Sequence, residues 1–142
     1  MPEMKHLIIA AALMLLAPTP GVSMESLSQF EWKNRVLVVF GDSGDPKIRS
    51  QLEAISTQKA ELADRDMVVL HVDGGDVRAF FGEAGKLNAR EIVAEASAPG
   101  DRFEAILVGK DGGIKLRSED VVSAVELFDL VDRMPMRQSE QR

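Results

Sequence analysis

The segment VLVVFGDSGDP, residues 36–46, changes abruptly from an apolar run to a polar loop of glycine, aspartate and serine. Consecutive apolar residues without alternation predict a strand that is buried on both faces. Asp45 followed by Pro46 is typical of a helix start, because aspartate caps free N–H groups and proline suits the first helical position. The segment therefore predicts a central strand, a tight loop and a helix.

Two further apolar runs, Met67–Val72 and Ala105–Val108, also predict buried strands. Residues 46–64, between the first two predicted strands, carry apolar residues at helical spacing. These residues are Ile48, Leu52, Ile55 and Leu62. A strand, a helix and a strand in this order predict a right-handed crossover between parallel strands.

We expect Trp32, just before the first strand, to pack as a lid over it, although an exposed tryptophan there could anchor a partner.

The segment after the second predicted strand carries one clear helix signal. Glycines and the pair Pro99-Gly100 divide residues 73–102 into loops. Within this segment, Asn88 and Glu91 have the spacing of a capping box. They predict a short helix that continues through Ala96.

The C-terminal part predicts a hairpin and then a last helix. Phe103–Lys110 and Ile114–Arg117 flank the turn Asp111-Gly112-Gly113, a pattern typical of a β-hairpin. Hydroxyl and acidic residues at 118–120 predict the start of the helix, and Pro135 predicts its end. The predicted inner face of this helix consists of Val121, Val125, Phe128 and Val131.

Taken together, these elements predict an α/β fold with a mixed central sheet of about four strands, helices on both faces, and a C-terminal hairpin followed by a helix. Their order is that of a thioredoxin-like fold without most of its usual first strand and helix. In that fold the active cysteines lie between the first of these strands and the next helix, where this chain has Gly41–Asp45. Because the chain contains no cysteine, we expect no redox chemistry.

Residues 1–23 are predicted to be a secretory signal peptide. Lys5 and His6 precede the uninterrupted apolar run Leu7–Ala17, and small residues follow at 21–23. The alternative is an uncleaved membrane anchor, although the run is shorter than the roughly 20 residues of a spanning helix. We therefore expect a periplasmic or secreted protein with one domain, residues 24–142.

The charge of the chain limits its partners. The formal net charge is −6, and loss of residues 1–23 leaves it unchanged because one acidic and one basic residue are removed. An acidic domain without basic blocks is a poor candidate for binding nucleic acid or anionic lipid. The predicted partner is an unknown protein or a small acidic ligand, with no nucleic acid and no membrane after signal cleavage.

Gly41-Asp42-Ser43 raises the question of a serine nucleophile, because trypsin-like proteases and GDS-type esterases carry similar motifs. Such a nucleophile needs a base beside it and a group that orients the base. Of the two histidines, His6 belongs to the predicted signal peptide and His71 lies within an apolar run. We therefore expect Ser43 to be unreactive, and the loop to turn the chain and cap the helix.

Acidic residues are predicted at the ends of the two parallel strands: Asp42, Asp45, Asp73 and Asp76. Carboxylates of this kind could form an oxygen-rich site for calcium or magnesium. Their spacing matches no calcium loop and acids at strand ends usually cap turns, so we predict neither a metal nor another cofactor. The alternative is a carboxylate- or metal-dependent enzyme that uses the Asp42-Ser43-Asp45 loop with Asp73 or Asp76.

Basic residues gather in the C-terminal part of this acidic chain: Lys110, Lys115, Arg117, Arg133 and Arg137. Lys115 and Arg117 are two residues apart on a predicted strand and should therefore face the same side. One interpretation is a binding patch for an acidic group. The other is structural, because basic side chains on an edge strand oppose aggregation and those at a helix end complement its dipole.

Two long motifs carry a resemblance to a known family. They are GKDGGIKLR at 109–117 and LFDLVDRMPMR at 127–137, with FEWKNR at 30–35 and ADRD at 63–66 in support. Together they resemble the domain of unknown function 4174 family, a thioredoxin-like domain of small exported bacterial proteins, over roughly residues 26–140. A related domain occurs in animal extracellular proteins with sushi repeats. The resemblance implies a thioredoxin-like fold outside the cytoplasm, and it implies no reaction and no catalytic residue.

Overall fold

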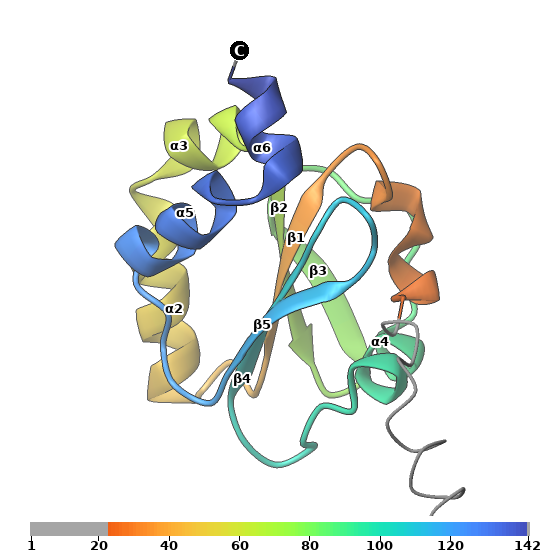
Figure 1. Ribbon diagram of the computed structural model, residues 1–142. Helices are drawn as coiled ribbons and strands as arrows, with labels where there is room; N and C mark the ends of the chain where they lie inside the picture. Colours follow the sequence, from red (N-terminus) through yellow and green to blue (C-terminus); the bar gives the residue numbers. More distant parts are fainter. Residues whose placement is uncertain (1–22, 142) are drawn as a thin grey trace, which may run out of the picture.

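The computed structural model describes residues 23–141, in which helices cover both faces of a five-stranded mixed sheet (Figure 1). The strands are β1 (Arg35–Phe40), β2 (Met67–Asp73), β3 (Asp76–Phe81), β4 (Glu104–Val108) and β5 (Ile114–Ser118). The helices are the short 3-10 helix η1 (Glu25–Phe30), α2 (Pro46–Ser56), α3 (Lys59–Asp64), α4 (Ala89–Ala96), α5 (Ala124–Asp132) and α6 (Pro135–Glu140).

The sheet has the order β3-β2-β1-β4-β5, with β1 at its centre. β1 runs parallel to β2, where Val38 pairs with Leu70, and antiparallel to β4, where it pairs with Ile106. Every residue of β1 and β4 is buried, and so are all residues of β2 but the last. The three predicted buried strands, the parallel crossover and the hairpin β4–β5 are thereby confirmed.

The sheet has one strand more than the predicted number of about four. β3 pairs antiparallel with β2 across the turn Gly74-Gly75, inside the segment that the sequence divides into loops. The strand signal there is weak because β3 lies at the edge of the sheet and none of its residues is fully buried. A strand without a buried face has no apolar alternation to reveal it.

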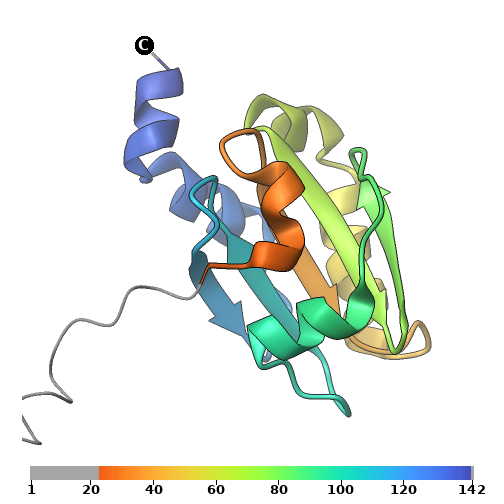
Figure 2. The same cartoon turned by 90° about the vertical axis from the view of Figure 1, so that its right-hand side faces the viewer.

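Apolar side chains fill both faces of the sheet. One cluster lies between the sheet and the pair η1 and α4, which stand in front of the strands in Figure 2. The other lies between the sheet and α2, α3 and α5 (Figure 1). Successive β1 residues alternate between the clusters, with Val38 in the first and Val39 in the second. This alternation explains why β1 is apolar from Val36 to Phe40.

The predicted helix over 46–64 is divided into α2 and α3. Its start is as predicted, since Asp45 accepts a hydrogen bond from the Lys47 N–H at 2.9 Å and Pro46 follows it. The break lies at residues 57–58. Ile55 and Leu62, on either side of the break, pack in the same apolar cluster. The spacing of the apolar residues therefore stays helical across the break, and the break cannot be predicted from that spacing.

The C-terminal helical segment differs from the prediction at three points. Ser118 is the last residue of β5, residues 119–120 form a bend, and α5 begins after Ser123, whose hydroxyl accepts a hydrogen bond from the Glu126 N–H. Val125 is 69% exposed, and Val122 and Leu127 are buried instead. Pro135 begins α6, because proline suits the first turn of a helix as well as the position after one.

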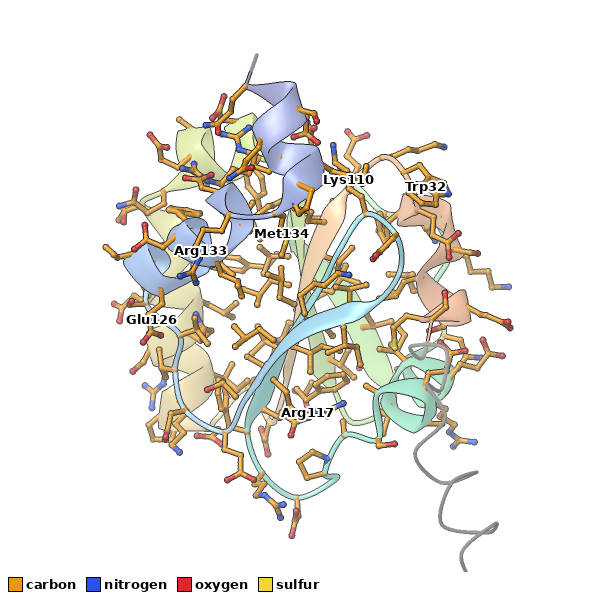
Figure 3. All side chains as sticks on the ribbon, viewed as in Figure 1. Trp32, Lys110, Arg117, Glu126, Arg133 and Met134 are labelled. Atoms are coloured by element: carbon orange, nitrogen blue, oxygen red, sulfur yellow. The ribbon has the colours of Figure 1, made fainter. Side chains whose placement is uncertain are left out.

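Trp32 is 66% exposed and projects away from the core (Figure 3), so the prediction that it covers β1 is wrong. Leu27 and Phe30 of η1 are buried on this side of the sheet. Trp32 has a φ of +64°, a left-handed conformation that is unusual for a bulky residue, and its N–H donates to the Lys110 carbonyl at 2.7 Å.

The predicted signal peptide falls on residues that lie outside the described part of the chain, apart from Ser23. Between residues 23 and 141, no helix is long and apolar enough to cross a membrane. Residues 24–141 form one sheet together with the helices and loops that surround it.

Candidate functional site

The loop 41–45 leaves β1 through a glycine that the backbone requires. Gly41 has a φ of +149°, and a Cβ at this position would lie 2.9 Å from the Ile48 side chain. Asp42 then accepts a hydrogen bond from the Gly44 N–H at 2.9 Å, and Asp45 caps α2. Both carboxylates therefore hold the turn and the helix start, as expected for aspartates in such loops.

Ser43 is held by Asp73 at the end of the neighbouring strand β2. Its hydroxyl donates to Asp73 at 2.6 Å and its N–H donates to the same oxygen at 3.2 Å. These two hydrogen bonds, the hydroxyl's being the stronger, hold the pKa of Asp73 below its usual value. A carboxylate with a lowered pKa is a weak base, so this pair fixes the loop and does not activate the serine hydroxyl.

His71 lies on β2 beside this loop and is buried. Its Nε2 is 2.8 Å from the Gly41 carbonyl oxygen, which can only accept, so Nε2 carries a proton and donates it to that oxygen. This nitrogen is therefore not available to take a proton from Ser43.

A cavity of about 420 Å³ opens at the same edge of the sheet. Asp42, Asp45 and Asp73 line it, together with Asp101 and Arg102 from the loop before β4. Asp76, the fourth predicted carboxylate, is the Cα partner of Asp73 in the β2–β3 hairpin and does not line the cavity. Within residues 23–141, no group of three or more histidine, aspartate and glutamate side chains is arranged to hold a metal ion.

The predicted basic residues have different surroundings. Lys110 and Arg137 are buried, with 8% and 4% of their surface exposed. Arg117 donates to Glu104 and to the Ala96 carbonyl, and Lys115 donates to Asp111 at 2.7 Å. In the described part of the chain only Arg133 among them makes no side-chain ion pair; it is exposed at the C-cap of α5 (Figure 3). A recognition role for these residues stays a prediction, and the structure shows four of the five bonded to acidic partners.

Lys110 and Arg137 belong to a larger set, which we call the C-terminal charge cluster. Its cations lie at the start of β1, at the C-cap of α3, after β4 and in α6, and its acids lie in α3, in the turn before β2, in α5 and in α6. The members are Arg35, Arg65, Lys110, Arg137, Asp64, Asp66, Asp132 and Glu140. Arg35, only 1% exposed, donates to both oxygens of Glu140 at 3.2 Å. The cluster joins α6 to the strand ends beneath it.

Two acids of the cluster, Asp132 and Glu140, have lowered pKa values. Hydrogen bonds from Arg65 are the main cause for Asp132 and outweigh the opposing effect of burial. Burial on its own would raise the pKa of Glu140, but hydrogen bonds from Arg35 and Lys110 outweigh it. The sequence shows the charges Asp64-Arg65-Asp66 but not their partners, which lie between 44 and 73 residues further along the chain.

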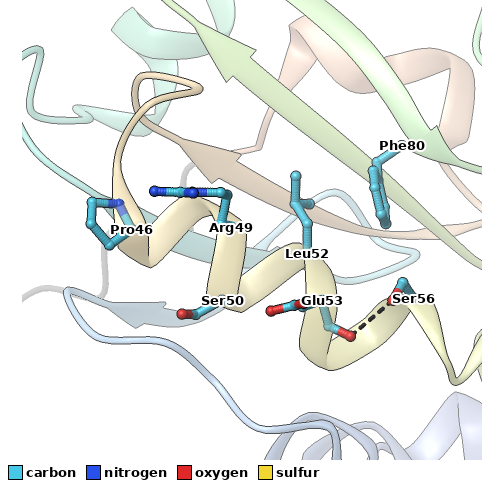
Figure 4. A pocket seen from close by; sticks show the side chains of 7 residues that line it. All are labelled: Pro46, Arg49, Ser50, Leu52, Glu53, Ser56 and Phe80. Atoms are coloured by element: carbon cyan, nitrogen blue, oxygen red, sulfur yellow. Dashed lines mark hydrogen bonds between the residues drawn. The ribbon is translucent and has the colours of Figure 1, made fainter.

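A groove between helix α2 and the edge strand β3 is the second concave surface. It consists of cavities of about 520 and 420 Å³ that share Arg49, Leu52 and Phe80. Leu52 of α2 and Phe80 of β3 point toward one another across it (Figure 4). Phe80 is 39% exposed, one of the few large apolar side chains that are open to solvent. We call this surface the α2–β3 groove.

The groove also has polar groups without partners. Arg49 and Arg78 both line its second cavity, and neither makes a side-chain hydrogen bond or ion pair within residues 23–141. Ser43 and His71 line the same cavity, and Glu53 lines the first. The sequence alone does not reveal this site because it depends on β3, a strand with only a weak sequence pattern. The spacing of Arg78 and Phe80 in a short run after Gly74-Gly75 was the available signal.

A known protein family matches most of the chain. A family model described as "Domain of unknown function (DUF4174)" matches residues 26–140. No curated protein matches the chain. The match runs from η1 to α6, and therefore includes the loop 41–45, the C-terminal charge cluster and the α2–β3 groove.

Proposed function

The chain belongs to the DUF4174 family, and we propose that it is an exported binding module with a thioredoxin-like fold and no redox chemistry. Export to the periplasm or the cell exterior is supported by Lys5 and the apolar run Leu7–Ala17. The absence of cysteine from the sequence supports the redox-inactive part of the proposal.

The order of elements supports the thioredoxin-like fold. A parallel crossover β1-α2-β2 is followed by helix α4 on the other face of the sheet, the hairpin β4–β5 and helix α5. The loop 41–45 lies between β1 and α2, where thioredoxin-like proteins carry their active cysteines. Here Asp42 and Asp45 accept hydrogen bonds from backbone N–H groups, and the Ser43 hydroxyl donates to Asp73 at the end of β2. This use of the loop favours a scaffold over a reaction centre.

The observation that carries the binding function is the α2–β3 groove. It combines an exposed Phe80 with Arg49 and Arg78, two cations without partners in the described residues. Exposed aromatic and arginine side chains beside each other are the groups that most often dominate protein interfaces. Among the other arginines that the structure describes, most already have an acidic partner, so the groove is where arginine side chains are available for binding.

The experiment is affinity capture from the medium or periplasm of the native cell. The bait is the full chain, and the test variant is Arg78→Glu with Phe80→Ala. The matched control is Arg133→Glu with Val125→Ala, which makes the same kind of changes at exposed positions of α5. We expect the test variant to lose a ligand that the wild type and the control both retain.

Equal capture by the two variants would contradict the assignment of the groove. Because all four positions are exposed, both variants should unfold within about 1 kcal/mol of the wild type. A urea titration of each variant checks that a lost ligand does not reflect a lost fold.

A further inference from the structure

We propose that the α2–β3 groove binds an extended acidic segment of a protein partner, which adds to the sheet as a strand beside β3. An acidic side chain of the segment lies between Arg49 and Arg78, and an apolar side chain two residues away packs on Phe80 and Leu52. This inference rests on the proposed binding function and names the class of ligand.

The backbone of β3 is free for such pairing. β3 is at the edge of the sheet and has β2 as its single strand neighbour. Within residues 23–141, no backbone group of 76–81 makes a hydrogen bond outside the β2–β3 ladder. Alternate N–H and C=O groups of an edge strand point away from the sheet and can pair with an added strand.

A bulge in β3 allows one strand to present both a free backbone edge and an aromatic side chain that points into the groove. Leu70 pairs with Ala79 and Val69 pairs with Phe81, so Phe80 is an extra residue in the ladder. A bulge redirects the side chain of the extra residue. Phe80 consequently points toward Leu52 of α2 (Figure 4). The regular part of the edge, Asp76–Ala79, remains for pairing, and the bulge limits how far an added strand can extend.

The charges of the groove select an acidic segment. Arg78 is the Cα partner of His71, which packs on the α2 side of the sheet, and it lines the same cavity as Arg49 from the helix. An incoming carboxylate between them would form charge-assisted hydrogen bonds that no protein group now supplies. Glu53 lines the adjoining cavity, so a segment that is acidic along its whole length would be repelled there. The preferred ligand has one acidic residue and one apolar residue two positions apart, so that both side chains lie on the same face of the added strand.

Synthetic peptides test this inference. The probes are threonine-rich peptides of about six residues, a typical strand length, with glutamate and phenylalanine two positions apart in either order. Binding to the full chain is measured by fluorescence anisotropy. We expect a peptide of this set to bind, and Arg49→Glu with Arg78→Glu to weaken it about 10- to 100-fold. Arg133→Glu is the charge-matched control and should leave the affinity unchanged.

Two changes in the peptide separate strand addition from other kinds of binding. Placing glutamate and phenylalanine next to each other puts them on opposite faces of a strand and should abolish binding. Methylating one backbone nitrogen at a time should abolish binding at alternate positions only. Binding that tolerates every methylation, or that Arg133→Glu weakens as much as the groove variant, would overturn the proposal. If no peptide binds but capture still depends on the groove, strand addition is wrong and the binding function stands.

Discussion

Removing the charge of Glu140 is the most informative perturbation of the fold. Glu140 accepts two hydrogen bonds from Arg35 at 3.2 Å and one from Lys110 at 2.7 Å. Arg35 keeps one other partner, the Arg65 carbonyl at 2.9 Å, and Lys110 keeps Asp66 at 2.8 Å. In Glu140→Gln the shape of the side chain is retained, but the buried Arg35 loses the one carboxylate that it binds within residues 23–141.

Removing one partner of a buried ion pair costs about 3–5 kcal/mol. The Glu140 side chain is 26% exposed and Lys110 keeps a second acid, so the cost should fall below that range, at about 2–3 kcal/mol. A domain of this size loses about 4 °C of melting temperature for each kcal/mol, so we expect a decrease of roughly 10 °C. Urea and thermal unfolding at pH 7, followed by circular dichroism, measure both quantities.

The effect should depend on pH in a defined direction. The pKa of Glu140 is lowered in the folded protein, because the hydrogen bonds from Arg35 and Lys110 outweigh the effect of burial. A lowered pKa stabilises the fold above the unfolded value of about 4.3, and this stabilisation is lost as the pH falls through the folded value. The difference between wild type and Glu140→Gln should therefore be full at pH 7 and shrink below about pH 4.

Glu83→Gln is the control for this prediction. Glu83 is exposed and makes no side-chain hydrogen bond within residues 23–141, so its replacement should change the free energy of unfolding by less than about 0.5 kcal/mol. Equal stabilities of Glu140→Gln and Glu83→Gln at pH 7 would refute the argument. A difference that persists unchanged to pH 3 would show that charge is not the cause.

Three further predictions concern the loop and the N-terminus. Asp45→Ala should lower the free energy of unfolding by about 1 kcal/mol through the lost cap of α2, and an unchanged urea midpoint would argue against the cap. A fluorophosphonate probe should leave Ser43 unlabelled because His71 donates to Gly41, and labelling that disappears in Ser43→Ala would favour the esterase alternative. Mass spectrometry of the protein from its native cell should find a chain that begins near residues 22–26, and an intact chain in the cytoplasm would contradict export.

The central part of the fold can be predicted from the sequence because its signals are local. β1 is apolar from Val36 to Phe40, and Asp45 and Asn88 each cap the helix that follows them. These signals depend on residues within one turn or one strand. Where a local signal has two meanings, the prediction fails: Pro135 can end a helix or begin one, and here it begins α6.

The C-terminal charge cluster and the α2–β3 groove could not be predicted because both depend on contacts between residues that are distant in the sequence. Lys110 and Arg137 appear as free cations in the sequence, and only the folded chain brings Asp66 and Asp64 to them. Arg78 likewise appears in the sequence as a single charge in an irregular segment, and only the pairing of β3 with β2 places it in the α2–β3 groove. Short-range patterns say nothing about which charges will meet across the fold.

Photo-cross-linking at Phe80 in the native cell tests the central claim most directly. A benzophenone amino acid replaces Phe80 in the groove and, in a second strain, the exposed Val125 on α5. The account predicts that Phe80 yields one dominant adduct, that Val125 does not, and that Arg49→Glu with Arg78→Glu removes the adduct. The same adducts at both positions, or an adduct at Phe80 that survives loss of both arginines, would contradict a binding function of the α2–β3 groove.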